Sequence, residues 1–299
     1  MKINICIPVF NEESNLEDFI NSIEDFIINT SHKDVHYSVI FYDDGSTDNS
    51  LNIIRNSNFK SISELNNKGL GYAINRLFEY SRDTGADGVI KIDCDGQMLI
   101  EEIDLFIEKV KKDSAIDLIQ GNRFTNSKDL KISSLKKSGI KFFKLLFKFL
   151  RINIQDTSNG FIYVSKRWLE DYKIIGNYNA AQQILLDTKF RNLNFVEQDV
   201  TIKNRESGKS FVGLRYPFNV ISTLISLAFY RRAKQALIMP GVFSVFVGLI
   251  LFINDFFLWA LGEENKIITN NIIIFLVIMG IQLLSIGLLI EFLKKQKTI

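Results

Sequence analysis

Two aspartates one residue apart, Asp93 and Asp95, directly follow a short apolar run. That run, residues 88–92, is typical of a buried strand. On an extended backbone alternate side chains point the same way, so both carboxylates would face one cation if the strand continues through them. Mg²⁺ and Mn²⁺ prefer oxygen ligands and often join one or two carboxylates to substrate phosphates. The pair predicts a metal–diphosphate site, and a solvated turn is the alternative because Asp-x-Asp alone is common.

The composition limits the class of protein. The chain has 299 residues and a formal net charge of +2, enough for one large domain or two modest ones. Near-neutral charge argues against a general nucleic-acid binder, so we expect no nucleic acid among the partners. Cys6 and Cys94 lie in unrelated apolar segments and indicate neither a disulfide nor a cysteine-rich metal site. Met1-Lys2 leads straight into a strand-like run, so we expect no signal peptide.

Strand-like and helix-like segments alternate along the part of the chain that must position these aspartates. Apolar runs predict strands over 2–9, 37–42, 59–62, 89–92, 116–119 and 195–202, and helical spacing predicts helices over about 16–27, 49–55, 72–82, 103–110 and 179–188. Thr47 or Asp48 is expected to cap the second helix. Short loops between alternating strands and helices are typical of a mostly parallel α/β sheet.

Carboxylates follow the ends of three of these predicted strands. They are Glu12, Asp43, Asp44, Asp93 and Asp95. In a parallel sheet those ends share one edge, where ligands bind in open α/β folds. Acidic groups gathered there repel one another unless a cation or polar ligand compensates. A helix cap or solvated loop explains any one of them, but three loops together favour a binding site.

Five short motifs occur in the order seen in family 2 glycosyltransferases of the GT-A fold. They are Ile7-Pro8-Val9-Phe10-Asn11-Glu12-Glu13, Asp43-Asp44-Gly45-Ser46, Asn67-Lys68-Gly69, Asp93-Cys94-Asp95-Gly96-Gln97 and Gly121-Asn122-Arg123-Phe124. Within that family the chain resembles the polyprenyl- and dolichyl-phosphate hexose transferases, such as dolichol-phosphate mannose synthase and the bactoprenol glucosyltransferases. The motifs lie within residues 1–215, which we expect to form a Rossmann-like GT-A domain.

The resemblance implies the donor site of a hexosyltransferase. The reaction it implies is inverting transfer of one hexose from a UDP- or GDP-sugar to polyprenyl phosphate, with Mg²⁺ or Mn²⁺ as cofactor. The nucleoside would be held by Pro8, Phe10, Glu12, Tyr42 and Asp44. Asp93 and Cys94 would lie at the ribose and diphosphate, and Asp95 and Gln97, together with Asp93, at the metal.

Three basic residues and one carboxylate are assigned to phosphates and acceptor by the same resemblance. Arg123 matches the phosphate-binding arginine, whose planar fork suits phosphate oxygens, although a surface arginine at a strand end is the alternative. Arg205 and Lys209 lie in a loop like Arg-x-x-Gly-x-Ser and would be further phosphate ligands, with an exposed basic turn as the alternative.

Asp156 is the candidate acceptor-side carboxylate, in a loop that resembles Asp-x-x-Ser-Gly-Phe with Asn159 where Ser is usual. A phosphate acceptor is largely ionised near pH 7, because the second pKa of a monoester is about 6. Asp156 would therefore orient groups rather than act as a strong base, and a turn-capping aspartate is the alternative.

The chain departs from the family pattern at three further places. The family often has an arginine before the helix at 131–151, where this chain offers Lys131, Ser133, Ser134, Lys136 and Lys137, so the acceptor-phosphate ligand stays open. Gln183 stands where relatives usually have Glu. Lys166-Arg167-Trp168 lacks the Gln of the Gln-x-x-Arg-Trp motif, which argues against a processive polysaccharide synthase.

The last part of the chain is strongly apolar. Residues 236–261 and 272–293 are each long enough to cross a hydrocarbon core of about 30 Å. Basic residues at 231–234 and 294–297 flank these runs on one side, so the positive-inside rule predicts a multi-pass inner-membrane protein with a cytosolic catalytic domain. Basic residues recur among apolar ones over 131–151, which favours an amphipathic helix in the membrane interface or an ordinary core helix.

These patterns predict three parts: a catalytic domain at 1–215, a juxtamembrane interface helix at 216–235 and a two-helix hairpin at 236–299. A soluble helical hairpin is the alternative for the last part. Rival functions are transfer to another membrane lipid or a lipid-linked oligosaccharide, and a catalytically silent membrane-anchored subunit. By analogy with relatives, a homo-oligomer such as a tetramer is possible.

Overall fold

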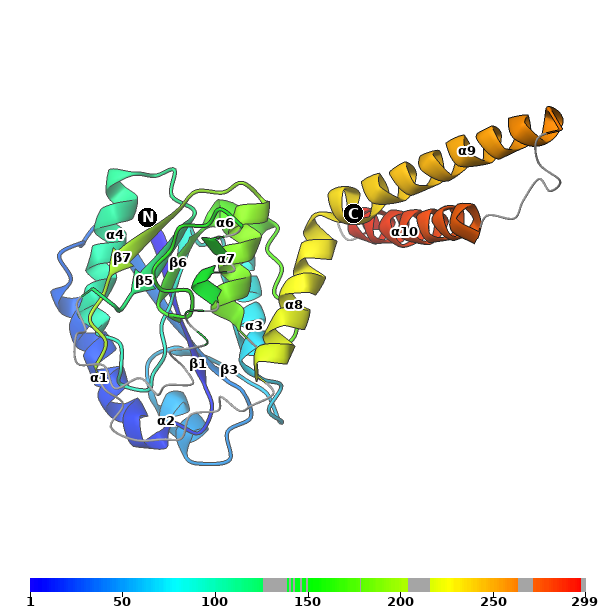
Figure 1. The fold of residues 1–299 in the computed structure, drawn as a ribbon. Coiled ribbons are helices and arrows are strands. Elements are labelled where there is room, and N and C mark those ends of the chain that lie inside the picture. The colour runs from blue at the N-terminus through cyan, green and yellow to red at the C-terminus, as the bar shows by residue number, and fades with distance from the viewer. Residues whose placement is uncertain are drawn as a thin grey trace. The chain divides into compact units, whose positions relative to one another are not determined.

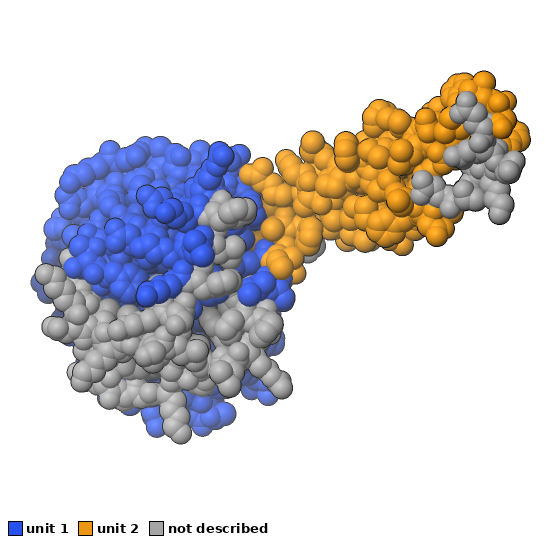
Figure 2. Space-filling view, viewed as in Figure 1, with its two compact units in different colours: residues 1–224 blue, residues 225–299 orange. Residues whose placement is uncertain are grey.

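The computed structural model describes residues 1–125, 139–203, 216–262 and 271–296, apart from residues 140, 142, 146, 149 and 178. The chain divides into two compact units, residues 1–224 and 225–299, which are described separately (Figure 2).

One mixed sheet organises the first unit (Figure 1). Its strands are β1 (Lys2–Val9), β2 (His36–Asp43), β3 (Lys60–Ser63), β4 (Gly88–Lys91), β5 (Leu118–Asn122), β6 (Ile162–Ser165) and β7 (Phe195–Asp199). Their order across the sheet is β3-β2-β1-β4-β6-β5-β7. Every neighbouring pair is parallel except those of β6, which runs antiparallel to β4 and β5. The predicted, mostly parallel α/β sheet is confirmed, with β6 as the reversed strand.

Helices cover both faces of this sheet. They are α1 (Glu13–Asn29), α2 (Ser50–Asn56), α3 (Leu70–Asp83), α4 (Ile103–Lys112), α6 (Lys166–Glu170) and α7 (Ala180–Phe190). A 3-10 turn, Ile100–Glu102, precedes α4, and the described residues between 139 and 148 are helical. The N-cap of α2 is Asn49 rather than Thr47 or Asp48, although Asp48 Oδ1 still accepts the Ser50 N–H at 3.0 Å.

The two faces of β1 explain its continuous apolar sequence. Ile3, Ile5 and Ile7 join the main core with Leu16 of α1 and Phe106 of α4. On the opposite face the Cys6 thiol lies 3.4 Å from Ser81 Oγ on α3. A strand buried on both faces favours apolar side chains at most positions, unlike an amphipathic edge strand, and Asn4 is the buried polar exception in β1.

The second unit is a helical hairpin. The end of α8 (Tyr216–Arg231) and a π-helical turn, Lys234–Ile238, lead into α9 (Met239–Ala260), and the chain returns as α10 (Asn271–Gln296). The stretches Lys234–Ala260 and Asn271–Gln296 are long and apolar enough to cross a membrane, with mean hydropathy 2.6 and 2.8.

Glycines bring the two hairpin backbones together. A Cβ on Gly241 would lie 3.0 Å from the carbonyl oxygen of Gly280, and a Cβ on Gly280 would lie 2.9 Å from that of Gly241. Ser244 Oγ donates to the Leu276 carbonyl across the same contact at 2.7 Å. Small residues at such crossings allow the close packing that holds apolar helices together in lipid.

Candidate nucleotide-sugar site

The carboxyl ends of β2, β1 and β4 lie side by side because these strands pair in parallel. The loops after them carry Glu12, Asp44 and Asp93, so the predicted gathering of strand-end loops at one sheet edge is confirmed.

Asp44 shapes the neighbouring loop. Its side chain is buried, and Oδ1 accepts the Lys68 N–H at 2.9 Å while Oδ2 accepts the Gly69 N–H at 2.7 Å. Gly69 adopts a φ of 94°, which favours glycine, and directly precedes α3. Asp44 therefore fixes the turn at which this loop enters α3.

The rings of Tyr42 and Tyr72 lie 6.5 Å apart beside the Glu64–Lys68 pair. The Tyr42 hydroxyl donates to Glu64 Oε1 at 3.1 Å, and the Lys68 ammonium lies 2.7 Å from Glu64 Oε2. Lys68 also lies 4.6 Å from the ring centre of Tyr72. Burial, followed by the Glu64 carboxylate, raises the pKa of Tyr42 above its ordinary value, so Tyr42 stays a neutral hydrogen-bond donor.

The end of β1 and the loop after β4 meet at Cys94. Its thiol lies 3.8 Å from the carbonyl oxygen of Pro8, and burial raises its pKa well above the usual value, with smaller contributions from Glu12, Asp93 and Asp95. Cys94 is thus a neutral, buried spacer that has carboxylates around it. Phe10 and Glu12 follow β1 and are partly exposed at this edge.

The backbone through the aspartate pair differs from the extended geometry that the sequence predicts. β4 ends at Lys91, and the chain bends at Cys94, Asp95 and Gly96, where Gly96 has a φ of 73°. Asp93 forms an ion pair with the buried Lys91, whereas Asp95 Oδ1 accepts the Gln97 N–H at 3.2 Å. The two carboxylates therefore have different surroundings, because a glycine turn replaces the expected strand.

The donor atoms at this turn fit a divalent cation that takes most of its ligands from a diphosphate. Within the described part of the chain, no three His, Cys, Asp or Glu side chains gather closely enough to form a metal site by themselves. Asp95 supplies a hard carboxylate, and Gln97 directs its Nε2 to the Lys203 carbonyl at 3.2 Å. Mg²⁺ and similar ions are commonly bound through one or two carboxylates plus substrate phosphates.

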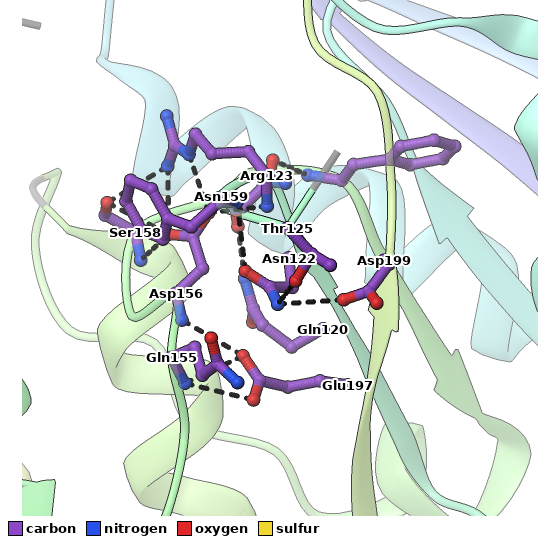
Figure 3. A network of polar contacts seen from close by, with 12 residues as sticks. Gln120, Asn122, Arg123, Thr125, Gln155, Asp156, Ser158, Asn159, Glu197 and Asp199 are labelled. Atoms are coloured by element: carbon purple, nitrogen blue, oxygen red, sulfur yellow. Dashed lines mark hydrogen bonds and ion pairs between the residues drawn. The ribbon is translucent and has the colours of Figure 1, made fainter. Parts of the chain in front are cut away.

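Arg123 and Asp156 lie together on the β5–β6 side of the sheet (Figure 3). Arg123 Nε donates to Asp156 Oδ2 at 2.6 Å and Nη2 donates to Oδ1 at 3.1 Å, a bidentate pair. Nη2 also donates to Ser158 Oγ at 3.0 Å. Asp156 is fully buried, while the Arg123 side chain is 23% exposed and its third nitrogen points away from Asp156 (Figure 3).

Glu197 on β7 holds the start of the Asp156 loop. Its Oε1 accepts the Gln155 and Asp156 N–H groups at 2.9 and 3.0 Å, and Oε2 accepts the Gln155 N–H at 3.0 Å (Figure 3). Burial raises the pKa of Glu197, although these two backbone groups oppose the shift. On the adjacent strand Asn122 Nδ2 donates to Asp199 Oδ1 at 2.8 Å.

The Asp156 loop ends beside the β4 turn. A Cβ on Gly160 would lie 2.7 Å from both Asp93 Oδ2 and the Lys91 ammonium. Asn159 fits here because its Oδ1 accepts the Phe161 N–H at 3.1 Å, and its carbonyl accepts from Gln120 Nε2 at 2.5 Å. The predicted donor and acceptor loops are therefore in direct contact.

Some predicted residues lie outside the described part of the chain, and some described residues were not predicted. Arg205, Lys209 and the basic segment 131–137 belong to the first group. Lys91 and Glu197 belong to the second group. Lys91 pairs with the nearby Asp93, and Glu197 accepts from the backbone of the distant Asp156, and no sequence motif encodes either contact. The position of Lys91 at the end of the β4 run was a usable signal, since lysine is rarely buried unpaired.

A mixed α/β sheet with an Asp-x-Asp turn after a central strand defines the GT-A-like class of fold. Among solved structures, glucosyl-3-phosphoglycerate synthase from Mycobacterium tuberculosis, in complex with Mn²⁺ and UDP-glucose, matches with a TM-score of 0.57. It is 22% identical over 76% of this chain and 78% of that one. Residues 4–173 match the family described as glycosyl transferase family 2, and the chain belongs to this family.

Several curated relatives resemble the chain. The bactoprenol glucosyl transferase of Shigella phage SfX is 29% identical over 191 residues, which are 62% of this chain and 59% of that protein. The dolichol-phosphate mannosyltransferase of Pyrococcus furiosus is 25% identical over 273 residues, which are 87% of this chain and 72% of that protein. The dodecaprenyl-phosphate galacturonate synthase of Rhizobium johnstonii is 22% identical over 99% of this chain and 88% of that protein. The chain thus spans less than two thirds of the bactoprenol enzyme's length.

Proposed function

We propose that the protein transfers one hexose from a UDP- or GDP-sugar to polyprenyl phosphate, with inversion and with Mg²⁺ or Mn²⁺, at the cytosolic face of a membrane. The contact at Gly160 carries the proposal, because it joins the loop of Asp156 to the turn that holds Asp93 and Asp95. A site in which two loops meet this closely can hold donor and acceptor next to each other.

The donor half of the reaction would use the β2 and β4 loops. The loop fixed by Asp44, with Tyr42 and Lys68, is suited to the nucleoside, and Asp95 with Gln97 to the cation. When bound, the cation offsets the charge that the leaving diphosphate gains. The carboxylates of this edge would hold the cation and the nucleoside, and the diphosphate between them would then present the sugar carbon to the acceptor.

The acceptor half would use the Arg123–Asp156 pair. Both Asp156 oxygens already accept from Arg123, and Oδ1 also accepts the Ser158 N–H at 3.1 Å, so this carboxylate positions the guanidinium. Arg123 in turn has a donor edge directed away from Asp156 for a phosphate. An ionised phosphate oxygen can attack without a general base, and attack opposite the leaving diphosphate inverts the sugar carbon.

The hairpin of α9 and α10 supports a lipid acceptor. A water-soluble sugar nucleotide and an insoluble polyprenyl phosphate meet only at a membrane surface, and two apolar helices would keep the enzyme there. Its relatives named for bactoprenol, dolichol phosphate and dodecaprenyl phosphate support the same acceptor class. The basic residues 231–234 and 294–297 support a cytosolic catalytic unit.

A panel of labelled UDP- and GDP-sugars tested with undecaprenyl phosphate and Mg²⁺ or Mn²⁺ examines the proposal. We expect one donor to give a single lipid-linked sugar that mild acid releases. A labelled diacylglycerol or lipid-linked oligosaccharide would instead support transfer to another lipid. Absence of any labelled lipid from the full chain in native membranes would favour a catalytically silent partner subunit.

A further inference from the structure

The 174–177 loop, which lies between α6 and α7, packs against the start of α3. A Cβ on Gly71 would lie 2.1 Å from the carbonyl oxygen of Gly176, and a Cβ on Gly69 would lie 2.7 Å from Asn177 Cγ. Both distances are far shorter than ordinary van der Waals contacts, so the loop can lie this close only because residues 69 and 71 are glycines. The loop therefore rests directly on the turn that enters α3.

Gln183 on α7 holds this loop by its backbone. The side chain is fully buried, its Oε1 accepts the Ile175 N–H at 2.7 Å, and its Nε2 donates to the Ile175 carbonyl at 2.9 Å. A carboxamide can make both bonds because it carries a donor group and an acceptor group. A second attachment comes from α3, where Asn75 Nδ2 donates to the Ile174 carbonyl at 3.3 Å. The loop is thus fixed at two successive residues.

The turn beneath the loop belongs to the donor side of the site. The Gly69 N–H donates to Asp44 Oδ2 at 2.7 Å, and the Lys68 N–H donates to Oδ1 at 2.9 Å. Gly69 therefore lies between the buried Asp44 carboxylate and the exposed Asn177. A displaced 174–177 loop would release this turn, and with it the two N–H groups that orient the carboxylate. Gln183 has no exposed surface, so any effect it has on a ligand passes through the loop.

We propose that Gln183 is a positioning residue for nucleotide binding, which acts through the 174–177 loop on the turn at Gly69 and so on Asp44. This inference rests on the proposed function, in which the loop fixed by Asp44 receives the nucleoside of the donor. Because Gln183 contacts neither donor nor acceptor, it sets the affinity for the nucleotide and not the rate of transfer from the bound donor.

Gln183→Glu makes the two bonds to Ile175 depend on pH. A neutral carboxyl group donates and accepts as the carboxamide does, whereas an ionised carboxylate has no donor and repels the Ile175 carbonyl. Burial should raise the pKa of a carboxyl group introduced at this position, because the charged form loses its hydration. The variant should therefore hold the loop at low pH and release it as the pH rises.

Calorimetric titration of UDP and of GDP, each with Mn²⁺, into the full chain in detergent measures this effect from pH 5 to pH 8. We expect the dissociation constant of Gln183→Glu, divided by that of wild type at the same pH, to rise from about one to about ten across this range. The division removes the titration of the nucleotide and of the groups that both chains share. Gln183→Met can make neither bond and should bind about tenfold more weakly than wild type at every pH. Gln198→Glu also loses an amide bond to a carbonyl, that of Asp199, and is the matched control that should bind as wild type does.

Asn177→Ala tests the same path from its other end and leaves the buried Gln183 in place. It removes the carboxamide that lies against Gly69, so nucleotide binding should weaken about threefold. The double variant Asn177→Ala with Gln183→Met should bind no more weakly than Gln183→Met alone, because both changes act on one turn. Wild-type affinity in Gln183→Met or in Asn177→Ala, or a Gln183→Glu ratio that does not rise with pH, would overturn the role of Gln183.

Failure of this role and failure of the proposed function give different results. Sugar transfer to lipid by variants whose nucleotide affinity equals that of wild type overturns the role of Gln183 alone. The expected series of nucleotide affinities without transfer of any labelled sugar to lipid keeps that role and overturns the proposed transfer. A wild-type chain that binds neither UDP nor GDP would overturn both.

Discussion

Asp44 on the β2 side and Asp156 on the β5–β6 side both use two carboxylate oxygens, but on different partners. Asp44 accepts two backbone N–H groups of the following loop, whereas Asp156 accepts a guanidinium. The first arrangement sets the shape of a loop, and the second neutralises charge in a buried place. We therefore expect changes on the β2 side to affect mainly ligand binding and changes on the β5–β6 side to affect mainly stability.

The largest effect is expected at the turn between the two sides. Asp95→Ala should lower sugar transfer by about a hundredfold or more, because the diphosphate loses the cation that offsets its charge. The measurement is incorporation of labelled sugar into lipid by membranes that contain equal amounts of each variant. Asp83→Ala, an exposed carboxylate on α3, is the control and should not differ from wild type. Equal transfer by Asp95→Ala and wild type would contradict a metal role at Asp95.

Asp156→Asn should mainly reduce stability. Breaking a buried ion pair from one side costs about 3 kcal/mol, which corresponds to a melting temperature roughly 6–12 °C lower for a domain of this size. Fluorescence of the buried Trp168 reports on this unit during heating. Arg76→Gln breaks the exposed pair with Glu79 and should shift the melting temperature by far less. Equal melting temperatures for Asp156→Asn and Arg76→Gln would show that the buried pair is not a stabilising contact.

Asp44→Asn should mainly weaken donor binding. An asparagine keeps one acceptor oxygen but turns an N–H group toward the loop, so one of the two contacts with Lys68 and Gly69 is lost. We expect KM for the sugar nucleotide to rise about tenfold, with kcat and melting temperature changed much less. A fall in melting temperature as large as that of Asp156→Asn would contradict the expected difference between the β2 side, which affects ligand binding, and the β5–β6 side, which affects stability.

The smallest effect concerns pH and Glu197. Because burial raises the pKa of Glu197 above its ordinary 4.5, the folded chain binds this proton more readily than the unfolded chain. Its contribution to stability is therefore largest below pH 4.5 and is lost as the pH rises through the raised pKa. Melting temperatures of wild type and Glu197→Gln should be compared from pH 4 to pH 8. We expect the melting temperature of wild type to fall relative to that of Glu197→Gln as the pH rises. A difference that is constant with pH would contradict this.

The sequence predicted the elements better than their pairings. Apolar runs and helical spacing located every strand of the sheet except β6, and every helix against it except α6, within a few residues, because burial on two faces favours apolar side chains. The reversed direction of β6 was not predicted, since an apolar run of four residues carries no direction. The loops of Glu12, Asp44 and Asp93 were expected at one edge, because parallel strands share their carboxyl ends.

Contacts between distant residues explain what the sequence could not supply. Arg123 and Asp156 were assigned separate roles, yet they pair across 33 positions of the chain. The argument that Asp93 and Asp95 face the same way assumed a strand, whereas Gly96 at a φ of 73° makes a turn there. Glycine allows either geometry, so spacing alone could not decide between them.

The close contact of α9 and α10 at Gly241 and Gly280, the glycine seam, has a consequence for how such a protein could evolve. With Gly241 and Gly280 backbone to backbone, the hairpin has no room for lipid tails between its helices and would insert as one rod. Many of its bulky residues are exposed, as Phe243 and Phe275 are. Outer residues can therefore change to suit bilayers of different thickness while the seam, and the chemistry at the sheet edge, stay as they are.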